Sequence, residues 1–288
     1  MSVVISQSEA VAPALTVHGR GTVSYGLGPD GVCRLKDLYQ GDPVRILFPT
    51  PPRGEIPSAV FVTTSGGLVG GDVIELFATA EKDARVLMIA QAAEKIYRST
   101  GADSRIDVSL TVENGAWLEW LPQETIVFDG ARLRRTTRVN VAKGGRLLAG
   151  EILVLGRGAM GETVHTGLVC DEWQVCREGR LTWADALLLE DDIPAVVDHP
   201  AGLGSAKAVA TVVFVADDAG DYLATARELL DTVNDDVRCG ATVVGGLLVV
   251  RFLALDPYLL RNAFGNFWAG FRRAAAGLPA ELPRLWHI

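Results

Sequence analysis

The apolar and polar residues between about 15 and 189 follow a rhythm of short strands and turns. The clearest example is Ile106–Val112, where apolar and polar residues alternate strictly. A period of two is typical of a strand with one buried face. The pair Asn114-Gly115 comes directly after it and favours a tight turn. We therefore predict a β-hairpin whose second strand is Trp117–Leu121.

Other apolar segments of this region have the length of strands, and glycine-rich turn signals separate them about every 10 to 14 residues. The predicted strands are Ala59–Thr63, Val73–Ala80, Arg85–Ala90, Thr125–Phe128, Leu133–Val141, Arg146–Leu155 and Glu162–Val169. This rhythm predicts a mainly β (α+β) fold, with either stacked antiparallel sheets or a β-solenoid-like body.

The pattern changes after Gly204. Val209–Ala216 is a continuous apolar run, as expected for a strand covered on both faces. Residues 221–234 carry apolar side chains at helical spacing, which predicts an amphipathic helix. Val243–Leu255 is a second long strand, which we expect to bend at Gly245-Gly246.

A last helix is predicted to begin at Asp256-Pro257, because Asp is a favoured N-cap and Pro a favoured first helical residue. The chain thus divides into a β-rich body (1–204) and a C-terminal β-α-β-α section (205–288). The segment 190–207, rich in Asp, Pro and Gly, is either the joint between them or an ordered loop, and the two parts can equally form one continuous domain.

Composition narrows the function. The 288 residues are 49% apolar with a mean hydropathy of +0.23, which excludes a disordered chain. A net charge of −8 argues against nucleic acid as a partner. No apolar run is long enough to span a membrane, and the first 15 residues lack the cationic start of a signal peptide. We expect a cytoplasmic protein with no membrane partner.

The chain has few of the residues that most often act as nucleophiles, proton carriers or metal ligands in enzymes, with only four cysteines and four histidines. The sequence Gly26-Leu27-Gly28-Pro29-Asp30-Gly31 matches a dinucleotide-binding pattern on paper. A strand-like segment follows it rather than a helix, so we interpret it as a turn. His165, Cys170 and Cys176 fit no standard zinc spacing, and Cys170 is expected to be a buried strand residue. No nucleotide-binding or serine-hydrolase motif is present.

Carboxylates embedded in apolar or glycine-rich segments are more informative. They are Asp72, Glu94, Glu119, Glu124, Asp129, Glu151 and Glu162. A carboxylate among large apolar groups must be paired, hydrogen-bonded, protonated or bound to a cation. Structural ion pairs with nearby arginines are the plain interpretation, and glycoside chemistry by two opposed carboxylates is the alternative.

One basic segment interrupts this acidic chain. Residues 131–149 contain six cations and no acid, and Arg132, Arg134 and Arg138 share the parity that places side chains on one face of a strand. Such a row forms either a solvated sheet face or a docking surface for an acidic protein partner.

Several of these segments, taken in order, resemble one family, the UreD (also UreH) urease accessory proteins. The matching stretches are Thr63–Asp72, Gln91–Ser99, Leu118–Ala131, Leu155-Gly156-Arg157, Gly161-Glu162 and Leu282–Trp286. The sequence LEWLPQETIVFDGA is the most specific of them. Where the family often carries a Thr-Thr pair just before the second stretch, this chain has Ile89-Ala90.

The resemblance implies a maturation chaperone rather than an enzyme. UreD-type proteins bind the urease apoprotein and the helical accessory protein UreF, which recruits the GTPase UreG, and the assembly helps to place nickel in urease. The implied fold is mainly β with a few C-terminal helices. No tightly bound cofactor is implied, only nickel(II) in transit, and GTP hydrolysis falls to UreG.

The resemblance also suggests roles for particular residues. Nickel in transit requires weak oxygen and nitrogen ligands, so we expect the motif carboxylates to form its route: Asp72, Glu119, Glu124, Asp129 and Glu162. We expect partner contacts from the arginine row and from Phe264, Phe267, Trp268, Phe271 and Trp286, although the plain alternative for these aromatic residues is the chain's own core. A carboxylate-dependent hydrolase and a standalone nickel carrier are the rival functions, and the lack of a His-rich tract disfavours the carrier.

Overall fold

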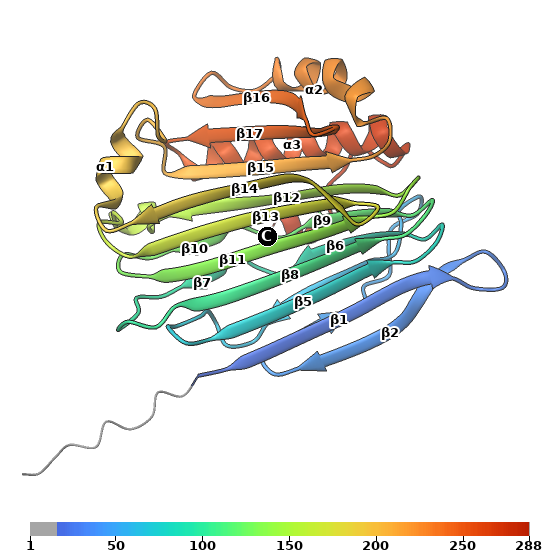
Figure 1. Ribbon diagram of the computed structural model, residues 1–288, viewed down its shortest axis with the longest axis horizontal. Coiled ribbons are helices and arrows are strands. Elements are labelled where there is room, and N and C mark those ends of the chain that lie inside the picture. The colour runs from blue at the N-terminus through green and yellow to red at the C-terminus, as the bar shows by residue number, and fades with distance from the viewer. Residues whose placement is uncertain (1–15, 288) are drawn as a thin grey trace, which may run out of the picture.

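Two β-sheets face each other in the computed structural model, which describes residues 16–287 (Figure 1). The seven-stranded sheet contains, from edge to edge, β14 (Arg180–Glu190), β13 (Leu168–Arg177), β11 (Arg132–Val141), β8 (Ser104–Val112), β5 (Val73–Ala80), β1 (His18–Leu27) and β2 (Cys33–Gly41). Its five central strands are parallel, and each edge strand is antiparallel to its neighbour.

The ten-stranded sheet is longer and also mixed. Its order is β16 (Val237–Val244), β17 (Leu247–Ala254), β15 (Ala208–Val215), β12 (Arg146–Leu155), β9 (Trp117–Leu121), β6 (Arg85–Ala90), β4 (Ser58–Thr63) and β3 (Val44–Leu47), with β10 (Thr125–Val127) between β12 and β7 (Glu94–Ile96). Strands β4, β6, β9 and β12 are parallel, and the remaining strands of the main path are antiparallel.

The chain alternates between the two sheets, and so winds a coil. Each of four turns contributes one strand to each sheet, in the pairs β1–β4, β5–β6, β8–β9 and β11–β12. Parallel neighbours within each sheet are the consequence of this winding. The prediction of a mainly β fold is therefore confirmed, and of its two forms the β-solenoid-like body is the one observed. Antiparallel pairing, which the stacked-sheet form would require throughout, is confined to the ends of the two sheets.

The predicted hairpin at Asn114-Gly115 is wrong. The turn exists, but it carries the chain from β8 in one sheet to β9 in the other, where β9 pairs in parallel with β6 and β12. All five residues of β9 are buried, because the opposite sheet covers one face and a helix covers the other. A hairpin partner of the half-buried β8 would have left one face of this apolar strand in water.

Most other predicted strands agree with the structure to within a residue or two, with two exceptions. Glu162–Val169 is mostly loop, and β13 begins only at Leu168. Val243–Leu255 is not one bent strand but the antiparallel hairpin β16–β17, because Gly245 and Gly246 both adopt positive φ, of 61° and 79°. The turn interpretation of Gly26–Gly31 is confirmed, since β1 and β2 form a hairpin around it.

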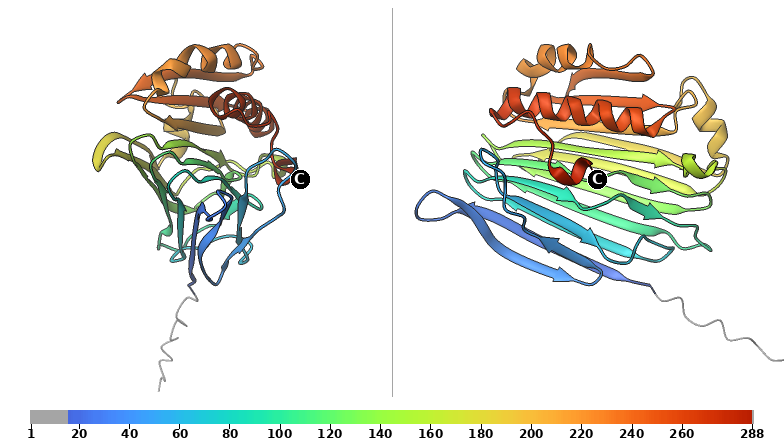
Figure 2. Two further views of the ribbon diagram at one scale, coloured as in Figure 1. Left: turned by 90° about the vertical axis from the view of Figure 1, so that its right-hand side faces the viewer. Right: turned by 180° about the vertical axis from the view of Figure 1, so that it is seen from behind.

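A helical layer covers the outer face of the ten-stranded sheet (Figure 2). It contains α2 (Leu223–Leu230) and α3 (Pro257–Ala276), while α1 (Ile193–Asp198) lies within the predicted joint. As predicted, Asp256 caps α3, with its carboxylate accepting a hydrogen bond from the Tyr258 amide at 2.8 Å. Gly150 in β12 permits the close approach, since a Cβ there would lie 2.7 Å from the Phe264 ring.

The molecule thus has two hydrophobic cores. The first lies between the two sheets, and the second lies between the ten-stranded sheet and helices α2 and α3. No helix among residues 16–287 is long and apolar enough to cross a membrane. The expectation about a signal peptide concerns residues that lie outside this range.

Candidate functional site

Most of the segments that carry the family resemblance come together along one side of the coil, where the chain passes from the ten-stranded sheet to the seven-stranded sheet. Strand β10 lies between β7 and β12, with Thr125 opposite both Glu94 and Leu153. The glycine-rich segment after β4 joins them, because the Leu68 amide donates to the Lys95 carbonyl at 2.7 Å. Four stretches that are separate in the sequence therefore form one continuous structure around β7 and β10.

Two predicted nickel-route residues, Asp129 and Glu162, meet on the surface of this structure, in a hollow that we call the motif shelf. It is lined by Tyr97, Arg98, Phe128, Asp129, Arg157, Glu162 and Thr163. Arg157 donates to Glu162 at 2.9 Å, and its guanidinium lies 4.3 Å from the centre of the Phe128 ring. Arg98 pairs with Asp129 at 3.1 Å.

The two shelf carboxylates are held in the ionised form. Asp129 accepts the backbone amides of His165 at 2.8 Å and Thr166 at 3.1 Å, and the first of these bonds is the main cause of its lowered pKa. The hydrogen bond from Arg157 is the main cause of the lowered pKa of Glu162. At neutral pH the shelf therefore presents two anionic carboxylates, each beside an arginine.

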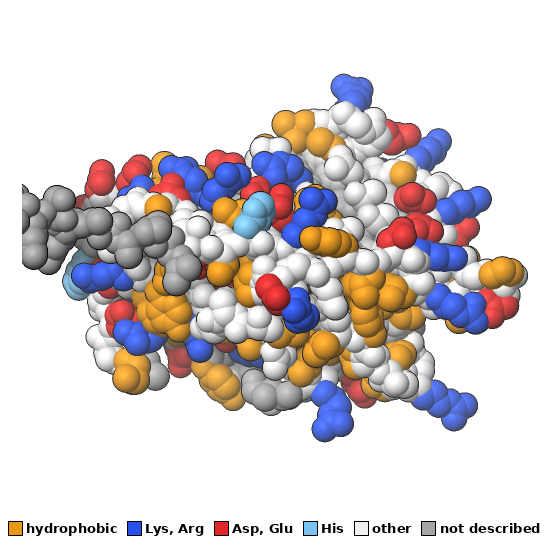
Figure 3. Space-filling view, turned by 90° about the horizontal axis from the view of Figure 1, so that it is seen from below, with side chains coloured by type: hydrophobic (Ala, Val, Ile, Leu, Met, Phe, Trp, Pro, Cys, Tyr) orange, Lys and Arg blue, Asp and Glu red, His pale blue; other side chains and the backbone are white. Residues whose placement is uncertain are grey.

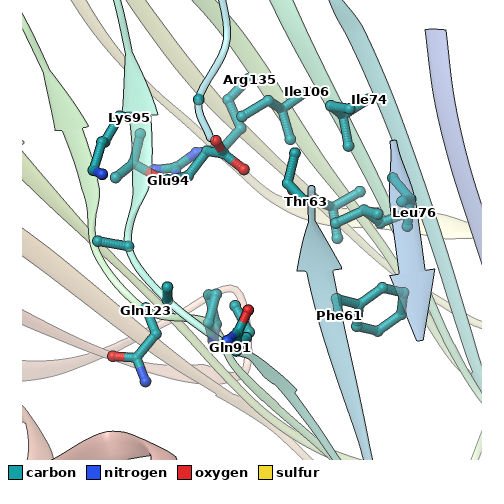
Figure 4. Close-up of a pocket in the computed structure, with 18 of the residues that line it drawn as sticks. Phe61, Thr63, Ile74, Leu76, Gln91, Glu94, Lys95, Ile106, Gln123 and Arg135 are labelled. Atoms are coloured by element: carbon teal, nitrogen blue, oxygen red, sulfur yellow. The ribbon is translucent and has the colours of Figure 1, made fainter. Parts of the chain in front are cut away.

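A cavity of about 170 Å³ lies behind this side of the coil, between the two sheets (Figure 4). Figure 4 shows Phe61 and Thr63 on one wall, Ile74 and Leu76 on another, and Glu94 projecting from the segment that carries Gln91 and Lys95. Burial raises the pKa of Glu94, and a hydrogen bond with Thr63 opposes this shift. The cavity is thus lined by both apolar and polar side chains, and the ionisable ones are Glu94, Lys95, Arg135 and Glu151.

A buried charge cluster closes the inner end of this cavity. Arg135, from β11, pairs with Glu151 at 2.7 Å and with Asp171 at 2.6 Å, and it donates to Thr125 at 2.9 Å. Thr137 donates to Glu151 at 2.7 Å. A second cavity, of about 240 Å³, lies beyond the cluster, and Arg135 and Glu151 line both cavities.

Burial raises the pKa of Glu151 to about 7, against the opposing effect of Arg135. Asp171 adds to the increase, because two carboxylates share one guanidinium. The interior of the coil therefore holds a carboxyl group that exchanges its proton near neutral pH.

The other predicted nickel-route residues lie apart from the shelf. Asp72 accepts the amides of Val17 at 2.9 Å and Val69 at 2.8 Å, and so fixes a turn. Glu124 forms an ion pair with Arg261 of α3. Within residues 16–287, no three His, Cys, Asp or Glu side chains gather in the manner of a metal site.

Glu119 lies in the second core and is fully buried. Its carboxylate accepts hydrogen bonds from the indoles of Trp117 at 3.0 Å and Trp268 at 2.9 Å, and from Arg272 at 3.0 Å. Arg272 also binds Glu55, through two bonds of 2.8 Å. This geometry matches the plain interpretation of these carboxylates as structural ion pairs.

The predicted arginine row lies on the outer face of the seven-stranded sheet. Arg132 and Arg134 both pair with Asp103 at 2.6 Å, and Arg138 pairs with Asp107 at 3.0 Å. The acids come from β8 and from the residue just before it, which lie beside β11 in the sheet but far from it in the sequence. The surface is therefore a mixed one, with its cations largely neutralised.

The aromatic residues predicted to contact a partner are buried in the second core. Phe264, Phe267, Trp268 and Phe271 have at most 2% of their surface exposed, and Trp286 has 6%. Trp286 stacks on Phe264 with 5.8 Å between ring centres, and Arg261 donates to its carbonyl at 2.5 Å. This burial favours the alternative that they form the chain's own core, and a contact with a partner stays a prediction.

The Arg135 cluster is the feature that the sequence did not single out. Glu151 was visible as a carboxylate inside an apolar strand, and Arg135 has the opposite parity to the other arginines of its strand. That parity was the available signal, since it places Arg135 on the buried face of β11. Nothing in the local sequence indicated Asp171 as its partner.

Comparison with known proteins gives a consistent picture. The model of the family described as "UreD urease accessory protein" matches residues 18–287. The chain is 49% identical over 261 residues to "Urease accessory protein UreD" of Magnetococcus marinus, covering 90% of each chain. It is 38% identical over 280 residues to the protein of the same name from Paracoccus denitrificans, covering 97% of this chain and 96% of the relative.

Proposed function

Because this chain belongs to the UreD family of urease accessory proteins, we propose that it is a non-enzymatic assembly factor for urease. It binds the urease apoprotein and UreF, and UreG joins through UreF and supplies GTP hydrolysis. The match over nearly the whole chain, to relatives that carry one name, is the observation that supports this role. The four cysteines are free thiols, which is consistent with a protein that acts in the reducing cytosol.

Nickel(II) is the cargo of this assembly in our proposal, and carboxylates of this chain guide it. Asp129 and Glu162 are the best placed of the five predicted residues, because they are ionised, share one surface hollow and belong to motif segments. Carboxylate oxygens bind nickel weakly enough for it to be passed on. Asp72 and Glu119 are buried, and Glu124 lies apart from the shelf in an ion pair with Arg261 of α3, so we expect these three to act mainly by holding the fold.

Single substitutions of the shelf carboxylates test the nickel route. We expect Asp129→Asn and Glu162→Gln to lower urease activation in cells while UreF and urease still co-purify with the chain. Glu190→Gln, at an exposed position at the end of β14 and outside the motif segments, is the matched control and should retain full activation. Full activation by both shelf variants, with complexes intact, would contradict the route.

We propose that the C-terminal section of the chain binds UreF. Its helix α3 and the tail after Gly277 form one unit, because Arg272 donates to the carbonyls of Pro279 at 2.9 Å and Glu281 at 3.2 Å. We expect a chain that ends at Gly277 to lose UreF on co-purification. If the shortened chain recovers as much UreF as the full chain, the tail is not part of the UreF interface.

A further inference from the structure

Exposed apolar side chains concentrate at one end of the coil. Among the described residues, seven of the fifteen exposed large apolar side chains fall within residues 27–48: Leu27, Val32, Leu35, Leu38, Tyr39, Leu47 and Phe48. These residues belong to the end of β1, to β2, to β3 and to the adjoining turns. Figure 3 views the molecule from this side and shows apolar patches on it. Exposed apolar surface of this kind marks an interaction site.

Strand β2 forms the edge of the seven-stranded sheet at this end. It pairs only with β1 among residues 16–287, and seven of its nine residues are exposed. The backbone N–H and C=O groups on its outer side are therefore available to another strand. It contains no proline, the residue that would block such pairing.

A bulge changes which residues of β2 share a face. Asp37 lies opposite Ser24 and Leu35 lies opposite Tyr25, so Lys36 is the extra residue. Leu35 and Leu38 consequently lie on the face of the buried residues Tyr25 and Val23. Arg34 and Tyr39 lie on the opposite face, across from Gly26 and Thr22.

This arrangement makes β2 complementary to itself. Two β2 strands from two copies of the chain can pair antiparallel, with the two-fold axis at the position between Lys36 and Asp37. Lys36 of each copy then faces Asp37 of the other copy, and Leu35 faces Leu38 in the same way. Arg34 faces Tyr39, a cation–aromatic pair. In a regular strand, facing residues of this register would point to opposite sides of the sheet, and the bulge is what brings each pair onto one side.

We propose that two copies of this chain associate through β2 in this register, with their seven-stranded sheets joined edge to edge. Every cross-strand pair then occurs twice, as two-fold symmetry requires. Opposite-charge and apolar pairs are the favourable ones in antiparallel sheets. The occupant of this edge is therefore a second copy of the chain, and the contact is independent of the nickel route and of UreF.

Charge reversal tests the register. The mass of the purified full-length chain is measured by sedimentation velocity over a range of concentrations, and we expect a dimer. Lys36→Asp and Asp37→Lys each place like charges opposite one another at two sites, so each should weaken the dimer at least tenfold. The double variant restores opposite charges and should recover the dimer.

Lys143→Asp, on an exposed turn away from β2, is the matched control and should leave the dimer intact. Thermal unfolding of each variant identifies those that fail to fold, and Leu35→Asp provides a second way to disrupt the edge. A monomer at every concentration, or a dimer indifferent to both single reversals, would overturn the proposal. So would a double variant that is no better than the singles, or a β2 edge occupied by a different protein.

Discussion

The two hydrophobic cores contain buried charge in different ways. In the second core, Glu119 is surrounded by two indoles and by Arg272, and aromatic rings from α3 fill the space around them. In the first core, Arg135 is shared by Glu151 and Asp171, and cavities of about 170 and 240 Å³ lie on either side of it. The first core thus holds its charge cluster between two cavities, whereas the second packs aromatic rings around Glu119 and has open space beside Arg272, which lines a groove of about 700 Å³.

The largest expected effect lies in the second core. Arg272→Met should lower the free energy of unfolding by about 3–5 kcal/mol, because it leaves Glu119 buried without a counter-charge. Arg273→Ala, at the exposed neighbouring position, is the control and should change it by less than about 0.5 kcal/mol. Urea unfolding of both variants measures the difference. Equal stabilities would mean that the Glu119 network does not hold α3.

The charge cluster of the first core should make stability depend on pH. The pKa of Glu151 is about 7 in the folded chain and near 4.5 when unfolded, so the folded chain retains this proton longer. Stability should therefore fall as the pH rises from about 4.5 to 7, by on the order of 3 kcal/mol.

Glu151→Gln should remove this part of the pH dependence, and the exposed control Glu228→Gln should not. Urea unfolding at pH 5 and pH 8 provides the comparison. An unchanged pH profile in Glu151→Gln would mean that the proton is not bound there.

Adding one methylene group should distinguish the two cores by packing. Val108 lines the cavity of the first core, whereas Val212 lies in the second core with 1% exposure. Val108→Ile should be neutral or stabilise the chain by up to about 0.8 kcal/mol, and Val212→Ile should destabilise it by about 1–3 kcal/mol. Thermal unfolding ranks the two variants, and the reverse order would contradict the difference in packing.

The smallest effect is expected on the outer sheet face. Arg138→Ala removes an exposed ion pair with Asp107, which typically contributes less than about 1 kcal/mol. Urea unfolding should therefore show almost no change. If this variant loses a urease subunit or UreF on co-purification, the arginine row is a docking surface, and if it binds both normally, the row is a solvated face.

Local pattern predicted the strands of this fold but not how they pair. Asn114-Gly115 was correctly identified as a turn, yet the same residues can join two strands of one sheet or carry the chain to another sheet. The outcome depends on what covers β9, and that covering includes α3, whose Trp268 is 149 residues away from Glu119. Gly245-Gly246 was similarly recognised as a change of direction but not as a full reversal.

The candidate site was predicted in part for the same reason. The sequence had already singled out Asp129 and Glu162, because both belong to motif segments. The structure adds that they lie in one hollow, the motif shelf. The Arg135 cluster depends on β11, β12 and β13 lying in two facing sheets, and no local pattern contains that information. Similarly, the single acid that pairs with both Arg132 and Arg134 is Asp103, which lies just before the neighbouring strand β8.

The most direct test of the account is the nickel content and activity of urease purified from cells that carry or lack this chain. With UreF, UreG and the urease subunits present in both strains, we predict full nickel occupancy and activity only when the chain is present. Asp129→Asn and Glu162→Gln should lower both quantities while the complexes still form. Urease that acquires its nickel equally well without this chain would contradict the proposed function itself.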